Sequence, residues 1–201
     1  ADILQLLSRE MLENNAPLLF PFLYKKWVCE NKLYLLMQPA DYNTVDNLPT
    51  NPTSPDSLIW WTEYLYQLSR AVYFLENHKI NHNDINLNNI LLQIVKPELA
   101  IMLIDYGSAV KDNKVHSGLP PFTLGRDLNY FLYEMIYSGI PNGYFPPELK
   151  KMESFITYQP VKTVETDTFL HGLNMANLTK PNPKTSGKYI SRWLVENYNI
   201  K

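Results

Sequence analysis

The sequence predicts an α+β fold, because helical and strand patterns both recur along its 201 residues. Residues 57–78 repeat apolar side chains at helical spacing and predict a long helix with one buried face. Two short apolar runs, at 90–92 and 100–104, are separated by the turn signal Lys96-Pro97-Glu98 and predict a β-hairpin. With 45% hydrophobic residues the chain can bury a core, and its length fits one domain or a pair of lobes.

The charge balance and the cysteine content exclude several kinds of partner and site. The net charge is −2 and no long basic block occurs, so we expect neither nucleic-acid nor membrane binding through bulk electrostatics. No apolar run reaches the length of a membrane span, and the first residues lack a signal-peptide pattern. Cys29 is the single cysteine, which excludes an internal disulfide, and we expect it to be a small buried apolar side chain.

These features predict an intracellular protein, in the cytoplasm or the nucleus, with packaging in a virion as a compatible alternative. The chain begins at Ala1 without an initiator methionine, so we expect a processed form or a piece of a longer protein.

The first forty residues predict one helix followed by two strands. The helix is expected over 2–14, where four apolar residues recur at helical spacing: Ile3, Leu6, Leu7 and Met11. The sequence Asn14-Asn15-Ala16-Pro17 ends it. Residues 23–29 and 32–37 predict strands joined by Glu30-Asn31.

The remaining elements are mostly helical. Residues 41–56 are polar and rich in proline, which predicts a surface linker before the long helix at 57–78. We expect a short helix from Pro146 to Phe155 that opens with proline, and a last helix over 190–198 after a loop at 179–187.

The residues with the clearest chemistry lie on both sides of the predicted hairpin. Asp84 can accept a proton from an attacking hydroxyl, and Asn89 and Asp105 supply the hard oxygen ligands that suit Mg²⁺. Phosphoryl transfer needs these parts, because its catalysis is mostly positioning and neutralisation of charge. The alternative for Asp84 and Asn89 is a loop in which each side chain bonds its own backbone.

The order of these residues resembles a protein kinase. His82-Asn83-Asp84 followed by Asn89 is similar to the kinase catalytic loop, and Asp105-Tyr106-Gly107 is similar to the metal-binding motif that follows a hairpin in that family. The resemblance covers about residues 10–139. It implies a kinase-like α+β fold with a partial small-lobe sheet at 1–40, including a hinge, and a mostly helical large lobe at 41–201. Tyr106 is typical of the casein-kinase-1 branch with its poxviral relatives and also of haspin-like kinases, and both branches stay open.

The resemblance implies ATP and Mg²⁺ as cofactors. Asp84 would orient and deprotonate a substrate hydroxyl, Asn86 would contact a phosphate oxygen, and Asn89 and Asp105 would hold Mg²⁺. Residues 125–135 resemble the buried central helix of the large lobe. Asp127 in that helix would cap the backbone of the catalytic loop, although an acid in the first turn of a helix is also favoured by the helix dipole alone. His82 and Tyr106 would pack against each other as structural residues.

An adenine site is implied where the second predicted strand runs into the hinge. Met37 would lie beside the adenine, the Gln38 carbonyl and the Ala40 amide would bond its edge, and Leu91 would lie under the ring. A buried strand that leads into an ordinary loop is the alternative. Glu10, with Glu13 as second candidate, would pair with an ATP-binding lysine, and a solvated acidic helix face fits both residues equally well.

Three departures from the family pattern stand in this chain. No glycine-rich loop and no Ala-x-Lys strand precede the first predicted helix. Asn86 occupies the position of the catalytic-loop lysine of serine/threonine kinases, and an amide cannot neutralise phosphate charge. Asn83 stands where many kinases carry an arginine that binds a phosphorylated activation segment, so we do not expect that form of switching.

The leading hypothesis is an ATP- and Mg²⁺-dependent serine/threonine protein kinase, or a piece of one, that acts on a protein substrate. One alternative is a catalytically inactive kinase-like protein that binds another kinase or an assembly partner. The other is a small-molecule kinase of the aminoglycoside or choline type, for which the run from Asp105 to Ala109 is less typical.

Overall fold

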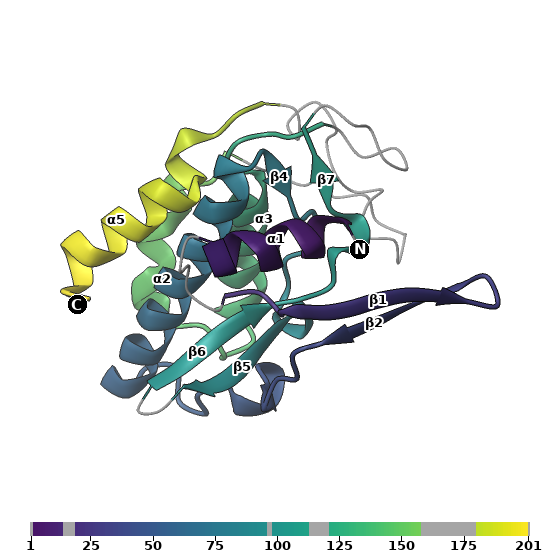
Figure 1. Cartoon of the computed structure of the whole chain (residues 1–201). Coiled ribbons are helices and arrows are strands. Elements are labelled where there is room, and N and C mark those ends of the chain that lie inside the picture. Colours follow the sequence, from purple (N-terminus) through teal and green to yellow (C-terminus); the bar gives the residue numbers. More distant parts are fainter. Residues whose placement is uncertain (1, 14–18, 96–97, 113–120, 158–179, 201) are drawn as a thin grey trace, which may run out of the picture.

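The structure is a computed structural model that describes residues 2–13, 19–95, 98–112, 121–157 and 180–200 (Figure 1). Its α-helices are α1 (Asp2–Glu13), α2 (Pro55–Asn77), α3 (Arg126–Glu134) and α5 (Gly187–Tyr198). Its strands are β1 (Leu23–Cys29), β2 (Lys32–Met37), β3 (Tyr42–Asn43), β4 (Ile80–Asn81), β5 (Ile90–Val95), β6 (Glu98–Leu103) and β7 (Val110–Lys111). Short 3₁₀ turns cover Val45–Asn47, Leu87–Asn89, Tyr106–Ser108, Pro147–Phe155 and Pro183–Thr185, and a π-helical turn covers Met135–Gly139. The described residues therefore form a mixed α+β structure.

The long helix α2 is the centre of the fold. It starts two residues before the predicted position, because Ser54 caps it by accepting a hydrogen bond from the Ser57 amide at 3.1 Å and Pro55 fits the first turn. Its apolar face is fully buried, with Trp61, Leu65, Leu68, Val72 and Leu75 all at most 1% exposed. The predicted helical periodicity is confirmed over this stretch.

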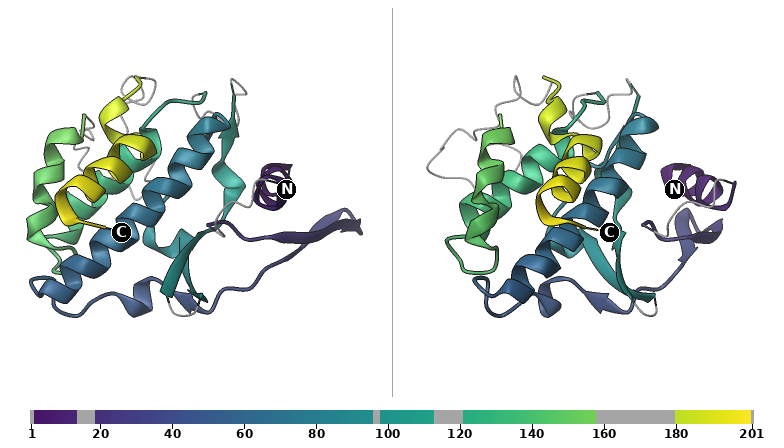
Figure 2. Two further views of the ribbon diagram at one scale, coloured as in Figure 1. Left: turned by 60° about the vertical axis from the view of Figure 1, so that its left-hand side comes forward. Right: turned by 90° about the vertical axis from the view of Figure 1, so that its left-hand side faces the viewer.

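Helix α5 lies along α2, as two views of the ribbon show (Figure 2). A Cβ atom added to Gly187 would come within 2.3 Å of the Ser69 carbonyl oxygen and of the Tyr73 amide nitrogen, so only glycine permits this close approach. The Gly187 amide also donates to the Glu76 carboxylate at 2.9 Å. The start of α5 is thus fixed against the last turns of α2 by both shape and a buried hydrogen bond.

The predicted hairpin over 90–104 is confirmed as the antiparallel pair β5–β6. Its neighbour β3 pairs with β5, and β4 pairs with β7 in a separate two-stranded ladder. The sequence did not predict β3, β4 or β7, because a strand of two residues shows no alternation of polar and apolar side chains. The stretch Pro147–Phe155, predicted as a helix, is helical but of the tighter 3₁₀ kind.

The hairpin β1–β2 projects away from the body of the molecule (Figures 1 and 2). Its predicted bounds are confirmed, and Glu30 and Asn31 both take positive φ angles, 49° and 60°, which match the tight turns that close hairpins. Most of its side chains are exposed, including Cys29. The expectation of a buried cysteine is therefore wrong, because Cys29 lies at the exposed end of β1, next to the hairpin turn.

Helix α1 packs onto the body through Leu4, Leu7 and Met11. Leu7 and Met11 belong to the same apolar core cluster as the buried face of α2. The core is thus continuous across residue 40, where we expected a boundary between 1–40 and 41–201, and that division stays a prediction.

Candidate functional site

The hairpin β5–β6 brings the backbones of Asn89 and Asp105 together. Ile90 pairs with Leu103 in the ladder, and the Ile104 amide donates to the Asn89 carbonyl at 2.9 Å. Asp105 directly follows Ile104, so its backbone lies next to that of Asn89 although sixteen positions separate them in the sequence. The predicted juxtaposition of these two loops is present in the structure.

The carboxylate of Asp84 is held by two amide side chains. Asn86 donates to its Oδ1 at 3.0 Å, and Asn89 donates to its Oδ2 at 2.8 Å. The Asn86 Oδ1 atom accepts hydrogen bonds from the backbone amides of Asn88 and Asn89, which caps the short turn Leu87–Asn89. Asp84 is therefore fixed in orientation while half-buried. The predicted contact of Asn86 with a phosphate oxygen stays a prediction.

Asn89 and Asp105 have the donor atoms that a magnesium ion would need. The amide nitrogen of Asn89 is bonded to Asp84, so its carbonyl oxygen Oδ1 is the atom left for a cation. Asp105 has a left-handed backbone, with φ 59°, and its Oδ1 accepts from the Gly107 amide at 3.1 Å while the residue is exposed. Across the described residues no group of three or more His, Cys, Asp or Glu side chains could hold a metal. One carboxylate and one amide suit Mg²⁺, which usually completes its shell with water and phosphate oxygens.

Asp127 binds the backbone of the loop that carries Asp84. Its carboxylate accepts from the amides of His82 and Asn83, each at 2.9 Å, and from the side chain of Asn81 at 3.3 Å. The residue is only 3% exposed. The predicted capping of this loop backbone by Asp127 is confirmed, and the position of Asp84, the next residue, depends on it.

His82 is a structural residue of the site. It is fully buried, its Nε2 donates to the Ile104 carbonyl at 2.7 Å, and its ring lies 4.8 Å from that of Tyr106, tilted by 59°. Burial lowers the pKa of His82, against the opposing effect of Asp127. The predicted packing of His82 on Tyr106 is confirmed, with tilted rather than parallel rings. A neutral His82 also links the two loops, because Ile104 precedes Asp105.

The residues of the predicted adenine site gather where β2 ends. The Gln38 amide donates to the Phe22 carbonyl at 2.8 Å, and the Asp41 amide donates to the Leu92 carbonyl at 3.2 Å. The chain at Ala40 is thereby brought beside β5, which carries Leu91. Met37, the last residue of β2, is 39% exposed. The roles of Met37, Gln38, Ala40 and Leu91 toward adenine stay predictions.

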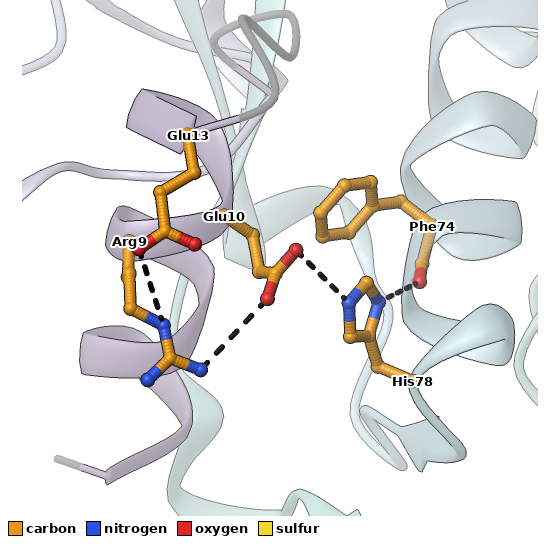
Figure 3. A network of polar contacts seen from close by, with 5 residues as sticks. All are labelled: Arg9, Glu10, Glu13, Phe74 and His78. Atoms are coloured by element: carbon orange, nitrogen blue, oxygen red, sulfur yellow. Dashed lines mark hydrogen bonds and ion pairs between the residues drawn. The ribbon is translucent and has the colours of Figure 1, made fainter.

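Glu10 points to a histidine (Figure 3). Its carboxylate lies 3.5 Å from the Nε2 of His78, just after α2, and 3.8 Å from the Arg9 guanidinium, while Glu13 lies 4.0 Å from Arg9. The other ring nitrogen of His78 bonds the Phe74 carbonyl at 2.9 Å. The pairing of Glu10 with an ATP-binding lysine stays a prediction, and no local pattern indicated the contact with His78, which is 68 positions away.

Two glutamates near the site, Glu134 with one buried oxygen and the buried Glu76, were not singled out from the sequence. Glu134 ends α3, and its Oε2 is buried without a hydrogen-bond partner in the part of the chain that the structure describes. Its pKa is raised by burial and by the charge of Asp84. The spacing of seven from Asp127, two helical turns, is the sequence signal that could have placed it on the same face. Glu76 bonds the amides of Gly125 and Gly187, at 3.0 and 2.9 Å.

The fold and the site together define an α+β protein with a fixed carboxylate, an adjacent amide and a second carboxylate beyond a hairpin. No family model matches the chain. The chain is 34% identical over 108 residues to the mitochondrial serine/threonine-protein kinase Pink1 of Tribolium castaneum. The aligned region covers 53% of this chain and 17% of that protein. This partial match indicates a relationship to protein kinases. The chain spans about a sixth of the length of the curated relative that it matches.

In the described residues, no helix combines the length and the apolar character that crossing a membrane requires.

Proposed function

We propose that this chain forms the catalytic-loop portion of a serine/threonine protein kinase with a kinase-like fold, which transfers a phosphoryl group from ATP to a protein hydroxyl. The observation that carries the proposal is the arrangement of Asp84, Asn89 and Asp105 on adjoining loops. Asp127 and His82 hold these loops in place through hydrogen bonds to their backbones. The partial match to a serine/threonine kinase supports the same class.

Each residue has a defined part in this proposal. Asp84, with each oxygen held by one amide, accepts the proton of the substrate hydroxyl as it attacks. Asn89 uses its nitrogen to orient Asp84, and its carbonyl oxygen together with Asp105 would hold Mg²⁺. When bound, the ion supplies neutralisation of the phosphate charge. Asn86 keeps Asp84 in place and adds no positive charge.

The test is transfer of labelled phosphate from ATP with Mg²⁺, by the full-length protein, to itself and to a generic protein substrate. We expect Asp84→Ala to lower kcat by at least 10²-fold, because a positioned base contributes about 10²–10⁴-fold. The matched control is Asp46→Asn, which removes an exposed carboxylate in the short turn Val45–Asn47. Equal rates for wild type and Asp84→Ala would refute the proposal.

A binding measurement separates the nucleotide site from the chemistry. Saturating ATP with Mg²⁺ at a hundred times its dissociation constant adds about 2.7 kcal/mol to the stability, which raises the melting temperature of a chain of this size by roughly 5–10 °C. We expect Asp105→Asn to abolish the dependence of this shift on Mg²⁺. A shift that is the same with and without Mg²⁺ would contradict the assigned metal role.

The non-catalytic alternative is favoured by one observation, the exposed apolar surface of β1–β2. Trp27, Val28, Leu33 and Leu36 are each 42–70% exposed on this hairpin, as expected of a surface that a partner covers. A tight protein complex that survives both Asp84→Ala and Asp105→Asn, together with absent transfer by the wild type, would favour this second function.

A further inference from the structure

Asn83 connects two separate parts of the chain to the catalytic loop. Its backbone is left-handed, with φ 64°, a conformation that asparagine tolerates. Its side-chain amide donates to the Ser108 carbonyl at 3.0 Å, and its Oδ1 accepts from the Arg126 guanidinium at 2.9 Å. Asn83 directly precedes Asp84, so each of these contacts bears on the backbone that carries the proposed base.

Arg126 extends the same connection to the start of α3. It is only 8% exposed, and its Nη2 donates to the Pro121 carbonyl and to the Thr123 hydroxyl. Burial lowers the pKa of Arg126, while the neighbouring Asp127 opposes that shift. A guanidinium offers its donors in a rigid fork, so one side chain can bind three acceptors from two segments at once.

The Thr123 backbone is held from a second side. Its amide donates to the Asn81 Oδ1 at 2.6 Å, and its carbonyl accepts from the Asn81 Nδ2 at 3.1 Å. The residues on both flanks of the segment between Ser108 and Pro121 are therefore tied to the strand and loop that precede Asp84.

We propose that Asn83 and Arg126 form a clamp of positioning residues that holds Ser108 and the Pro121–Thr123 stretch against the catalytic loop without phosphorylation. The proposal rests on the proposed kinase function for its effect on turnover. A phosphoryl group orders such a segment by adding charge for an arginine to bind. Here Asn83 supplies a neutral acceptor for Arg126 instead. Arg126 also binds Pro121 and Thr123 directly, without a phosphoryl group between them.

The first experiment measures amide hydrogen exchange in the full-length protein and in Arg126→Met, which keeps the side-chain length and removes the donors. We expect faster exchange at Thr123 and also at Ser108–Lys111, because Asn83 joins the Arg126 guanidinium to the Ser108 carbonyl. Asn83→Ala gives the same two-sided loss and serves as the second variant where Arg126→Met folds poorly. The matched control is Arg192→Met, which removes an exposed arginine of α5 that pairs with Glu196. Loss of protection at Thr123 alone would overturn the clamp.

The second experiment measures turnover. We expect Arg126→Met and Asn83→Ala each to lower kcat by about tenfold or more with the KM for ATP unchanged. The double variant should be no more than about twofold worse than either single variant, because residues that act as a unit are not additive. Arg126→Lys should recover little, since one ammonium cannot replace the fork.

Treatment with a protein phosphatase should leave wild-type kcat within twofold. Additive losses, or a phosphatase-sensitive kcat, would overturn the proposal. Absent turnover in the wild type would instead refute the proposed function, and the exchange data would still decide the clamp.

Discussion

The body of the molecule and the hairpin β1–β2 carry tryptophans in opposite environments. Trp61 of α2 is fully buried, donates to the Tyr144 carbonyl at 2.9 Å and meets Phe145 edge-on at 4.9 Å. Trp27 of β1 is 42% exposed and stacks on Tyr34 of β2 at 5.5 Å. The same side chain thus contributes to a packed core in one region and to an open surface in the other. This difference indicates that the body supplies the stability, whereas the hairpin presents a surface.

The largest expected effect is the loss of Trp61. We expect Trp61→Ala to lower the free energy of unfolding by about 4 kcal/mol, because it leaves a cavity and an unbonded Tyr144 carbonyl in the core. Urea unfolding of the variant and the wild type measures this directly. A loss below about 1 kcal/mol would mean that α2 does not organise the core as described.

Asp127→Asn is expected to rank second. The asparagine keeps one acceptor oxygen and places an NH₂ group against the amide of His82 or Asn83, so one buried donor loses its partner. We expect the free energy of unfolding in urea to fall by about 2–3 kcal/mol. Turnover should fall by a larger fraction than stability does, because the same amides position Asp84. Asp46→Asn is the matched control and should change stability by less than about 0.5 kcal/mol. An Asp127→Asn variant with wild-type stability and full activity would show that the loop geometry does not depend on this carboxylate.

Glu76 makes the stability of the body depend on pH. Its pKa is raised to about 7, because burial outweighs the hydrogen bonds from Gly187 and Gly125. An acid whose folded pKa exceeds its unfolded value near 4.5 stabilises the protein fully below that value, and this contribution is lost as the pH rises toward 7. We expect wild-type stability to fall by on the order of 2 kcal/mol between pH 4.5 and pH 7.5 relative to Glu76→Gln. A difference that runs in the opposite direction would show that the two backbone hydrogen bonds dominate over burial.

The sequence predicted the parts of the fold that depend on periodicity and turn chemistry. The bounds of β1 and β2 follow from the apolar pattern between breakers, and Glu30-Asn31 marks the turn of the hairpin, whereas the helix α3 was expected from the family resemblance. The two-residue strands and the π-helical turn at Met135–Gly139 were not predictable in this way, because they arise from long-range pairing and packing.

Part of the site could also be predicted, because its contacts follow from short motifs. Asp127 binds the loop backbone and His82 packs on Tyr106, as the family resemblance implied, whereas the hydrogen bond from His82 to the Ile104 carbonyl was not predicted. The contacts of Arg126 with Asn83 and of Glu10 with His78 join residues 43 and 68 positions apart, and no local pattern encodes them. The exposure of Cys29 was missed for a related reason, since burial depends on whether a strand is covered and not on its composition.

The smallest expected effect is on the hairpin side of the comparison. We expect Trp27→Ala to lower the free energy of unfolding by less than about 1 kcal/mol, because a cross-strand aromatic pair contributes about 0.2–1 kcal/mol and the side chain is already partly in water. The same urea series that measures Trp61→Ala measures it, with Tyr34→Ala as the matched partner variant. The sum of the two single losses should exceed the loss in the double variant, because both single variants remove the same ring contact. A loss comparable to that of Trp61→Ala would mean that the hairpin packs on the body in solution, and the contrast between the two regions would then fail.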